Sequence, residues 1–313
     1  YLTANQPYPQ ADIATAWKKL LFNQFHDILP GTSIPEVFVD ANRDWAKVEE
    51  IGKRVLEESL AALAHQIAIP ITPHPEAKLI IVYNSLSWPR SSVVTHHMPE
   101  SSPGILSFSW EIRDELKQVI PHQADFTDQT KQGHCQVSFL AKDIPAVGYR
   151  CFWLCPTEQD HSNLEPVQDN PPYQLENSYL KATISATTGQ ITSLIEKLAQ
   201  KETLSAPGNQ LQTFKDQGQY WDAWNIDPNY TRHPLPSPTL ESVVWINKGA
   251  IRQRIRTIHK FQNSTITQYY TLNAETPHLN IETYIDWQDA QVLLKAYFPL
   301  SISSDFATYE IPF

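Results

Sequence analysis

Several features that would place this chain in a specialised class of protein are scarce or absent. Its 313 residues contain three cysteines, nine glycines and a single methionine, Met98. There is no run of 18 apolar residues, so the sequence predicts no transmembrane helix. The 24 lysines and arginines are outnumbered by 34 aspartates and glutamates and form no cluster, so we expect no nucleic-acid partner.

The three cysteines, Cys135, Cys151 and Cys155, are too few and too far apart for a disulfide framework. Cys151 and Cys155 fall on one predicted strand, about 13 Å apart at roughly 3.3 Å per residue. A disulfide requires Cα atoms within about 7 Å. We therefore expect reduced thiols in the core. The N-terminus also shows no secretory signal pattern, so we expect a cytoplasmic protein without membrane contact.

The pattern along the chain changes from helical to strand-like at a proline-rich boundary. Residues 1–11 indicate a linker from an upstream domain, residues 12–69 a helical bundle, and residues 70–78 a proline-rich linker. Residues 79–313 indicate a β-sandwich domain that is truncated at its C-terminal end. Because the chain starts at Tyr1 and ends on a strand-like segment at Phe313, we expect both ends to be cuts inside a longer polypeptide.

Apolar residues at helical spacing predict at least two antiparallel helices joined by a short turn. The first begins near Asp12 as its cap, runs through Ile28 and stops at Pro30 and Gly31. Residues 33–36 read Ser-Ile-Pro-Glu, which indicates a capping box that starts a second, long helix. The apolar pattern of this second helix allows for one break in the helix along its length.

Beyond residue 78 the apolar period becomes two, which is typical of strands separated by turns. The predicted fold class is therefore α then β, an antiparallel helical bundle followed by a mainly antiparallel β-sandwich. The expected strands cover residues 79–83, 93–97, 136–140, 149–154, 179–185, 251–259, 265–272, 279–287 and 292–298.

One pair of ionisable residues, His26 and Asp27, stands at the end of the first helical pattern. From spacing alone, two interpretations stay open. The histidine is either half-buried and bonded to backbone near a helix C-terminus, or it is a ligand. A single histidine cannot form a metal site, which needs three or four ligands.

Four segments in chain order resemble glycoside hydrolase family 38, the α-mannosidases. Residues 17–31 contain Trp-Lys-Lys-Leu-Leu and Gln-Phe-His-Asp-Ile-Leu-Pro-Gly, and residues 82–90 read Val-Tyr-Asn-Ser-Leu-Ser-Trp-Pro-Arg. Residues 208–227 begin with Gly-Asn-Gln-Leu-Gln and include Tyr-Trp-Asp-Ala-Trp-Asn-Ile-Asp. Residues 286–299 contain Asp-Trp and Leu-Leu-Lys-Ala-Tyr-Phe-Pro. The resemblance covers essentially the whole chain.

The resemblance implies an enzyme of three parts: an α/β barrel, a helical bundle and a β-sandwich region, of which this chain supplies the last two. It implies a retaining hydrolase of terminal α-mannosides that uses Zn²⁺ or another divalent metal. His26 corresponds to one metal ligand and Asp27 to a contact with sugar hydroxyls. The catalytic carboxylates have no counterpart here, so we expect the isolated chain to be inactive and metal-free, with its own N-terminal barrel as partner.

The tryptophan-rich segment at 221–224 carries two further candidates. Trp221 and Asp222 either contact the sugar or, in the alternative interpretation, the tryptophans pack into a seam between domains.

Alternative functions also stay open. One is a non-catalytic carbohydrate-binding or structural β-sandwich module. Another, within the same family, is a hydrolase of mannosylglycerate. The sequence does not identify the linkage, the natural substrate or the oligomeric state, which leaves a homo-oligomer open.

Overall fold

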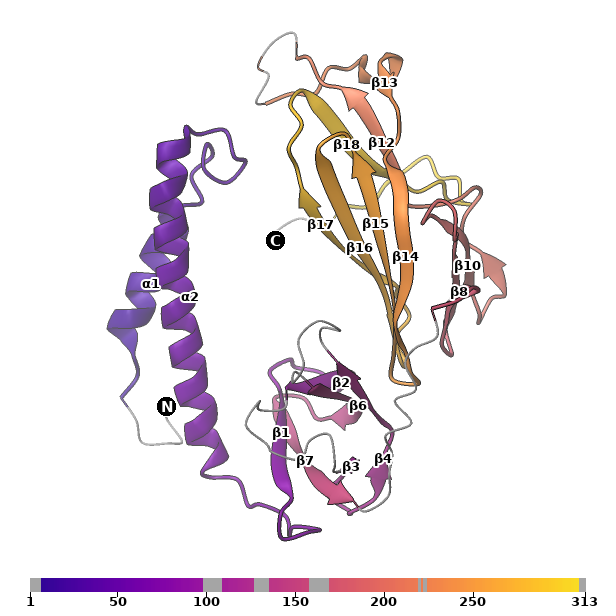
Figure 1. Cartoon of the computed structure of the whole chain (residues 1–313). Helices are drawn as coiled ribbons and strands as arrows, with labels where there is room; N and C mark the ends of the chain where they lie inside the picture. The colour runs from indigo at the N-terminus through magenta and orange to yellow at the C-terminus, as the bar shows by residue number, and fades with distance from the viewer. Residues whose placement is uncertain are drawn as a thin grey trace. The chain divides into compact units, whose positions relative to one another are not determined.

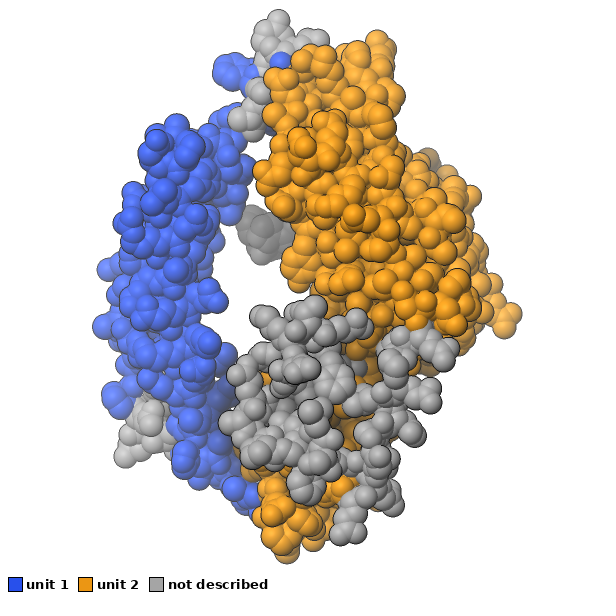
Figure 2. Space-filling view, viewed as in Figure 1, with its two compact units in different colours: residues 1–70, 218–226 blue, residues 71–217, 227–313 orange. Residues whose placement is uncertain are grey.

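The structure is a computed structural model that describes residues 7–97, 109–126, 135–157, 169–218, 221 and 224–309. The chain divides into two compact units, residues 1–70 with 218–226 and residues 71–217 with 227–313 (Figure 2). Two helices come first in the chain and antiparallel sheets follow (Figure 1). This order confirms the predicted fold class, α then β.

The first unit contains the helices α1 (Gln10–Phe22) and α2 (Pro35–Ala64). Lys19 bonds to Asp44, and Arg54 donates to Asp12 at 2.7 Å. Since later residues of α1 pair with earlier residues of α2, the two helices are antiparallel. Neither described helix has an apolar stretch that could span a membrane.

Both ends of the turn between the helices differ from the prediction. The first helix ends at Phe22 rather than Ile28, because the Asn23 side chain bonds the Lys19 carbonyl at 2.9 Å and terminates the helix. The predicted capping box is wrong: α2 has Ile34 as its N-cap and Pro35 in its first turn, with no side-chain cap. A residue before proline is held in extended conformation, so Ile34 cannot be helical. The second helix is unbroken.

The second unit begins with a β sandwich, which we call the first β section, formed by β1 to β7. One sheet has the order β1-β7-β3-β4 and the other β2-β6-β5. Ile112, Phe139, Phe152 and Leu154 from the facing sheets are buried together in its core. The strands are β1 (Lys78–Asn84), β2 (Arg90–His97), β3 (Ser109–Arg113), β4 (Val119–Ile120), β5 (His122–Phe126), β6 (Cys135–Ile144) and β7 (Gly148–Thr157).

The second β section follows, with sheets in the orders β11-β10-β9-β8, β14-β15-β16-β17 and β13-β12-β18. Leu175, Ile184, Ile255 and Tyr270 lie in a core shared by the first two of these sheets. The strands are β8 (Tyr173–Glu176), β9 (Leu180–Ile184), β10 (Ile191–Glu196), β11 (Lys201–Glu202), β12 (Gln210–Lys215), β13 (Pro234–Leu235), β14 (Thr239–Lys248), β15 (Arg252–Phe261), β16 (Ser264–Asn273), β17 (Asn280–Asp286) and β18 (Val292–Tyr297), with a 3₁₀ turn η1 (Tyr230–Arg232).

Every predicted strand overlaps an observed one, but several observed strands carry no clear period of two. β14 is the longest of these, and its pairing with β15 shifts register at Leu240/Ser242 and at Trp245/Asn247. Each shift moves the following side chains to the other face, so the alternation is broken within the strand.

Side-chain bonds from several residues join the two β sections. Arg252 donates to the Thr95 hydroxyl at 3.2 Å, and Lys142 donates to the Glu275 carboxylate at 2.5 Å. Gln123 makes the largest number of these bonds among the described residues. The Gln123 oxygen on β5 accepts from the backbone N–H groups of Ile251 and Arg252 at 3.3 and 3.1 Å. Its amide nitrogen donates to the Arg252 carbonyl at 3.2 Å. Gln123 thus bonds this backbone from a position 129 residues away in the sequence.

Candidate functional site

The residues between α1 and α2 form a closed turn around Asp27. The Asp27 carbonyl accepts from the N–H groups of Thr32 and Ser33 at 3.1 and 2.8 Å, and the Thr32 hydroxyl lies 3.3 Å from the Asp27 carboxylate. Gly31 has a φ of +83°, a left-handed conformation that side chains rarely adopt. Ile28 is buried and anchors the turn. The backbone that carries His26 and Asp27 is therefore fixed by several bonds.

His26 lies on the outside of this turn. Its side chain is 69% exposed and that of Asp27 is 36% exposed, with Nε2 and Oδ2 3.6 Å apart. The only other contact that the structure gives the imidazole, among the residues that it describes, is the Phe25 ring, whose centroid is 4.2 Å away. The half-buried structural histidine that spacing allowed is therefore not what is observed.

Several apolar side chains close to this pair in the sequence are exposed. Leu21, Phe22, Phe25, Leu29 and Ile34 are all exposed. Exposed apolar side chains that cluster in this way, rather than singly, are typical of surfaces that contact a ligand or another protein segment. His26 and Asp27 are thus flanked in the sequence by exposed apolar side chains, of which Phe25 contacts the imidazole.

The described residues do not complete a metal site. No group of three or more His, Cys, Asp or Glu that could hold an ion occurs in the described ranges. His26 and Asp27 offer one imidazole and one carboxylate, which is fewer than the three or four protein ligands of a zinc centre.

The tryptophan loop is described only in part. Trp221 is 75% and Trp224 65% exposed, and the Trp221 carbonyl accepts from the N–H groups of Trp224 and Asn225 at 2.7 and 3.0 Å. Asp222 lies outside the described residues. In the part of the loop that is described, Trp221 has no hydrogen bond or ring contact with His26 or Asp27, so the structure does not bring these candidates together.

Two asparagines in the sequence motifs have clear structural roles that spacing did not reveal. Asn84 is buried. Its amide nitrogen donates to the carbonyls of Trp88 and Pro145 at 2.8 and 3.0 Å, and its oxygen accepts from Leu86 N–H at 3.1 Å. An Asn-x-Leu turn signal that precedes a proline could have suggested this role.

Asn209 belongs to a buried polar network in the second β section. Its amide nitrogen donates to the Tyr270 hydroxyl at 2.5 Å and to the Gln268 oxygen at 3.0 Å. Tyr270 in turn donates to the Gly189 carbonyl at 2.8 Å. The residue at 209 therefore joins three segments inside the core and is not available to a ligand.

Comparisons with known proteins agree with this division into helices and sheets. The family model for the alpha mannosidase middle domain matches residues 1–63. The model for the glycosyl hydrolases family 38 C-terminal domain matches residues 175–313.

Similar proteins are found among curated sequences and among solved structures. Alpha-mannosidase 2C1 of Mus musculus is 26% identical over 321 residues, which cover 98% of this chain and 26% of that protein. Alpha-mannosidase G of Dictyostelium discoideum is 22% identical, with 98% and 29% covered. The crystal structure of an alpha-mannosidase from Enterococcus faecalis V583 has a TM-score of 0.72 at 17% identity, and the match covers 96% of this chain and 40% of that one.

This chain spans about a quarter of the length of the curated relatives that it matches. The two family models lie in chain order, and the matching crystal structure has the same fold. The chain therefore belongs to glycoside hydrolase family 38, the α-mannosidases, and consists of the middle and C-terminal domains of that family, without its catalytic domain.

Proposed function

We propose that this chain is the non-barrel part of a zinc-dependent retaining α-mannosidase that hydrolyses terminal α-mannosides. His26 is the zinc ligand that it contributes, and Asp27 contacts sugar hydroxyls. The observation that carries the proposal is an exposed imidazole on a fixed turn, 3.6 Å from a carboxylate, within the segment that matches the family's middle domain.

The chain by itself does not fit a zinc ion, since it offers only two donors at this turn. The remaining ligands and both catalytic carboxylates belong, in this proposal, to the catalytic barrel of the family. The exposed apolar side chains near His26 in the sequence support the same view, because Phe22, Phe25 and Leu29 would be covered when a barrel packs on the turn.

The roles of the two residues follow from their chemistry. A neutral imidazole of His26 has one nitrogen lone pair for a metal, and its other nitrogen keeps a proton that a neighbouring acceptor can hold. The Asp27 carboxylate accepts hydrogen bonds and so suits the hydroxyls of a pyranose. Bound zinc would polarise sugar hydroxyls and favour distortion of the ring, and the barrel's carboxylates would carry out the retaining displacement.

The test uses the enzyme that joins this chain to a family 38 catalytic barrel. We expect H26A to lower the zinc content to below a tenth of the wild-type value and to abolish hydrolysis of an aryl α-mannoside. We expect D27N to keep the zinc and to raise KM. Zinc content is measured by plasma mass spectrometry on gel-filtered protein.

H278A is the matched control, because His278 is exposed on the surface of the second β section. This variant should keep wild-type zinc content and activity. Wild-type zinc in H26A would refute the assignment of the ligand, and activity of the 313-residue chain alone would refute the location of the carboxylates.

The two interpretations of Trp221 and Asp222 can be separated in the same enzyme. If Trp221 contacts the sugar, W221A raises KM and leaves the unfolding temperature unchanged. If the indole packs between domains, W221A instead lowers the unfolding temperature. D222N provides the corresponding test for the carboxylate.

We also propose a cytoplasmic location, supported by the free, buried thiols of Cys151 and Cys155. Cell fractionation tests this point, and recovery of the protein in the secretory fraction would contradict it.

A further inference from the structure

The outward face of the sheet β14-β15-β16-β17 carries, at its edge, two exposed side chains, Tyr284 and Asp286, beside two half-buried threonines, Thr265 and Thr267. The strand β17 is the edge strand, paired on one side with β16. We infer that Thr265, Thr267, Tyr284 and Asp286 form a binding patch for a neutral pyranoside. The patch lies in the second β section, and its existence does not depend on the zinc ligand proposed above.

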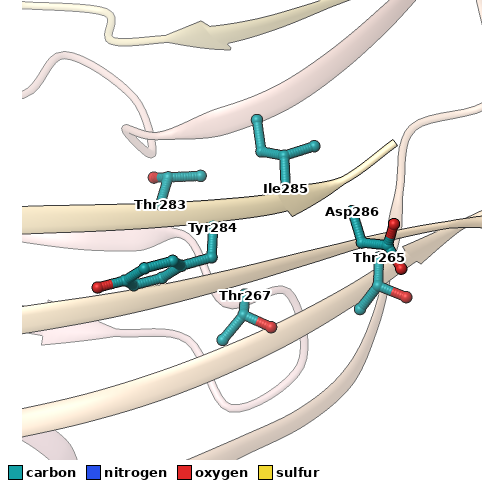
Figure 3. A pocket seen from close by; sticks show the side chains of 6 residues that line it. All are labelled: Thr265, Thr267, Thr283, Tyr284, Ile285 and Asp286. Carbon is teal, nitrogen blue, oxygen red and sulfur yellow. The ribbon is translucent and has the colours of Figure 1, made fainter. Parts of the chain in front are cut away.

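The register of the strands brings these four residues to one face. Thr265 is paired with Asp286, and Thr267 with Tyr284. Alternate residues of a strand share a face, so the four side chains form a rectangle of about 5 Å across the strands and about 7 Å along them. Those dimensions suit one sugar ring. Figure 3 shows Tyr284 and Asp286 on the opposite side of β17 from Thr283 and Ile285.

The tyrosine ring is held in place from one side. The Arg254 guanidinium lies 4.1 Å from the Tyr269 ring centroid, and the Tyr269 and Tyr284 rings are perpendicular, 5.9 Å apart. Arg254 is itself fixed by Glu282 at 2.6 Å. Tyr284 remains 61% exposed. A ring that is ordered before binding presents an apolar wall at little entropic cost, and its electron-rich face attracts the C–H groups of a sugar.

The polar groups of the patch are only partly used. Lys260 donates to the Thr265 hydroxyl at 2.7 Å, and Gln288 donates to one carboxylate oxygen of Asp286 at 2.6 Å. Within the described ranges, the structure gives no hydrogen-bond partner to the other Asp286 oxygen or to the hydroxyls of Thr267 and Tyr284. These groups can accept from and donate to sugar hydroxyls.

An open hollow of about 450 Å³ runs along the edge of this sheet. It is lined by Thr265, Thr267, Tyr284 and Asp286 on the outward face, and by Thr283 and Ile285 on the other side of β17. A ligand would therefore rest on the surface with one face in solvent, which agrees with weak binding. Because Lys260 and Asp286 balance one another and the chain carries a net charge of −10, a neutral ligand is favoured over an anion. A hydroxyl-rich ring with one apolar face satisfies every group described.

The test is a titration of the 313-residue chain with α-linked mannobiose, followed by saturation-transfer NMR in the presence of EDTA. We expect a dissociation constant on the order of 1 mM. Y284A should weaken binding by about fivefold or more, because it removes the aromatic wall. The conservative substitution T267V should weaken binding by about threefold. This second variant tests the patch even if Y284A does not fold.

Y297A is the matched control, since Tyr297 is an exposed tyrosine on β18 of another sheet. It should bind as the wild type does. The proposal is overturned if the wild type gives no signal, if both T267V and Y284A bind normally, or if Y297A loses binding equally. A concentration-dependent dimer that Y284A dissociates would also overturn it, in favour of a protein contact. None of these results bears on the zinc content of H26A.

Discussion

Replacing Tyr270 by phenylalanine deletes one oxygen atom from the core of the second β section. The side chain is fully buried, and its hydroxyl accepts from Asn209 and donates to the Gly189 carbonyl at 2.8 Å. Without it, the Gly189 carbonyl loses its donor, while the Asn209 amide keeps Gln268 at 3.0 Å. Each lost bond costs about 1 kcal/mol and an unpaired buried carbonyl about 1 kcal/mol more, so we expect Y270F to lower the unfolding free energy by about 2–3 kcal/mol.

The same substitution has a distinct pH dependence. Burial raises the pKa of the Tyr270 phenol to about 12. A tyrosine whose folded-state pKa lies above the unfolded value of about 10 stabilises the protein fully below pH 10 and loses that contribution as the pH rises toward 12. At pH 11 the wild type should have lost about 1.4 kcal/mol that Y270F does not lose. The difference in unfolding free energy between the wild type and Y270F should therefore be smaller by that amount at pH 11 than at pH 7.

The assay is urea unfolding at pH 7 and pH 11, followed by tryptophan fluorescence, to which Trp245 of the same core contributes. Y284F is the control, because it removes an exposed phenol from the same sheet and should change stability by less than about 0.5 kcal/mol. The reasoning is refuted if the unfolding free energies of Y270F and the wild type differ by less than about 1 kcal/mol at pH 7. It is also refuted if that difference stays constant up to pH 11.

Three further predictions concern unfolding and reactivity of the β sections. N84D should lower the unfolding free energy by about 2–4 kcal/mol in urea, because a carboxylate cannot donate to the carbonyls that Asn84 binds. G249A places its Cβ 1.8 Å from the Gln123 oxygen and should lower the unfolding free energy by about 2 kcal/mol. In a Q123A background the same substitution should lower it by less than about 1 kcal/mol, which a double-mutant cycle measures. Cys151 and Cys155, whose thiol pKa values are raised mainly by burial, should be alkylated only after unfolding, as peptide mass spectrometry will show.

Local patterns predicted the regular parts of the fold well. The period of two along residues 251–259 and 265–272 identified β15 and β16, since both strands bury alternate side chains in one core. The helical spacing of α2 was equally clear. The end of α1 and the start of α2 were less predictable, because neither depends on a repeated pattern. Asn23 ends α1 through a side-chain hydrogen bond, and Pro35 restricts the backbone of Ile34 sterically.

Long-range features could not be predicted from local patterns. The pairing of β12 with β18 and the bond between Gln123 and Arg252 join residues that are remote in sequence. The candidate site likewise has a part that the sequence indicated and a part that depends on long-range structure. The resemblance to family 38 made His26 and Asp27 candidates, whereas their exposure on a closed turn depends on backbone bonds that no spacing rule contains.

The asparagines at 84 and 209 have a consequence for how relatives of this chain are interpreted. Both belong to segments that make the chain recognisable as a member of its family, yet both side chains hold backbone and core groups together. Both residues therefore act on the stability of the β sections. Both asparagines in a homologous sequence would therefore indicate an intact β domain, whether or not that homologue is an active enzyme.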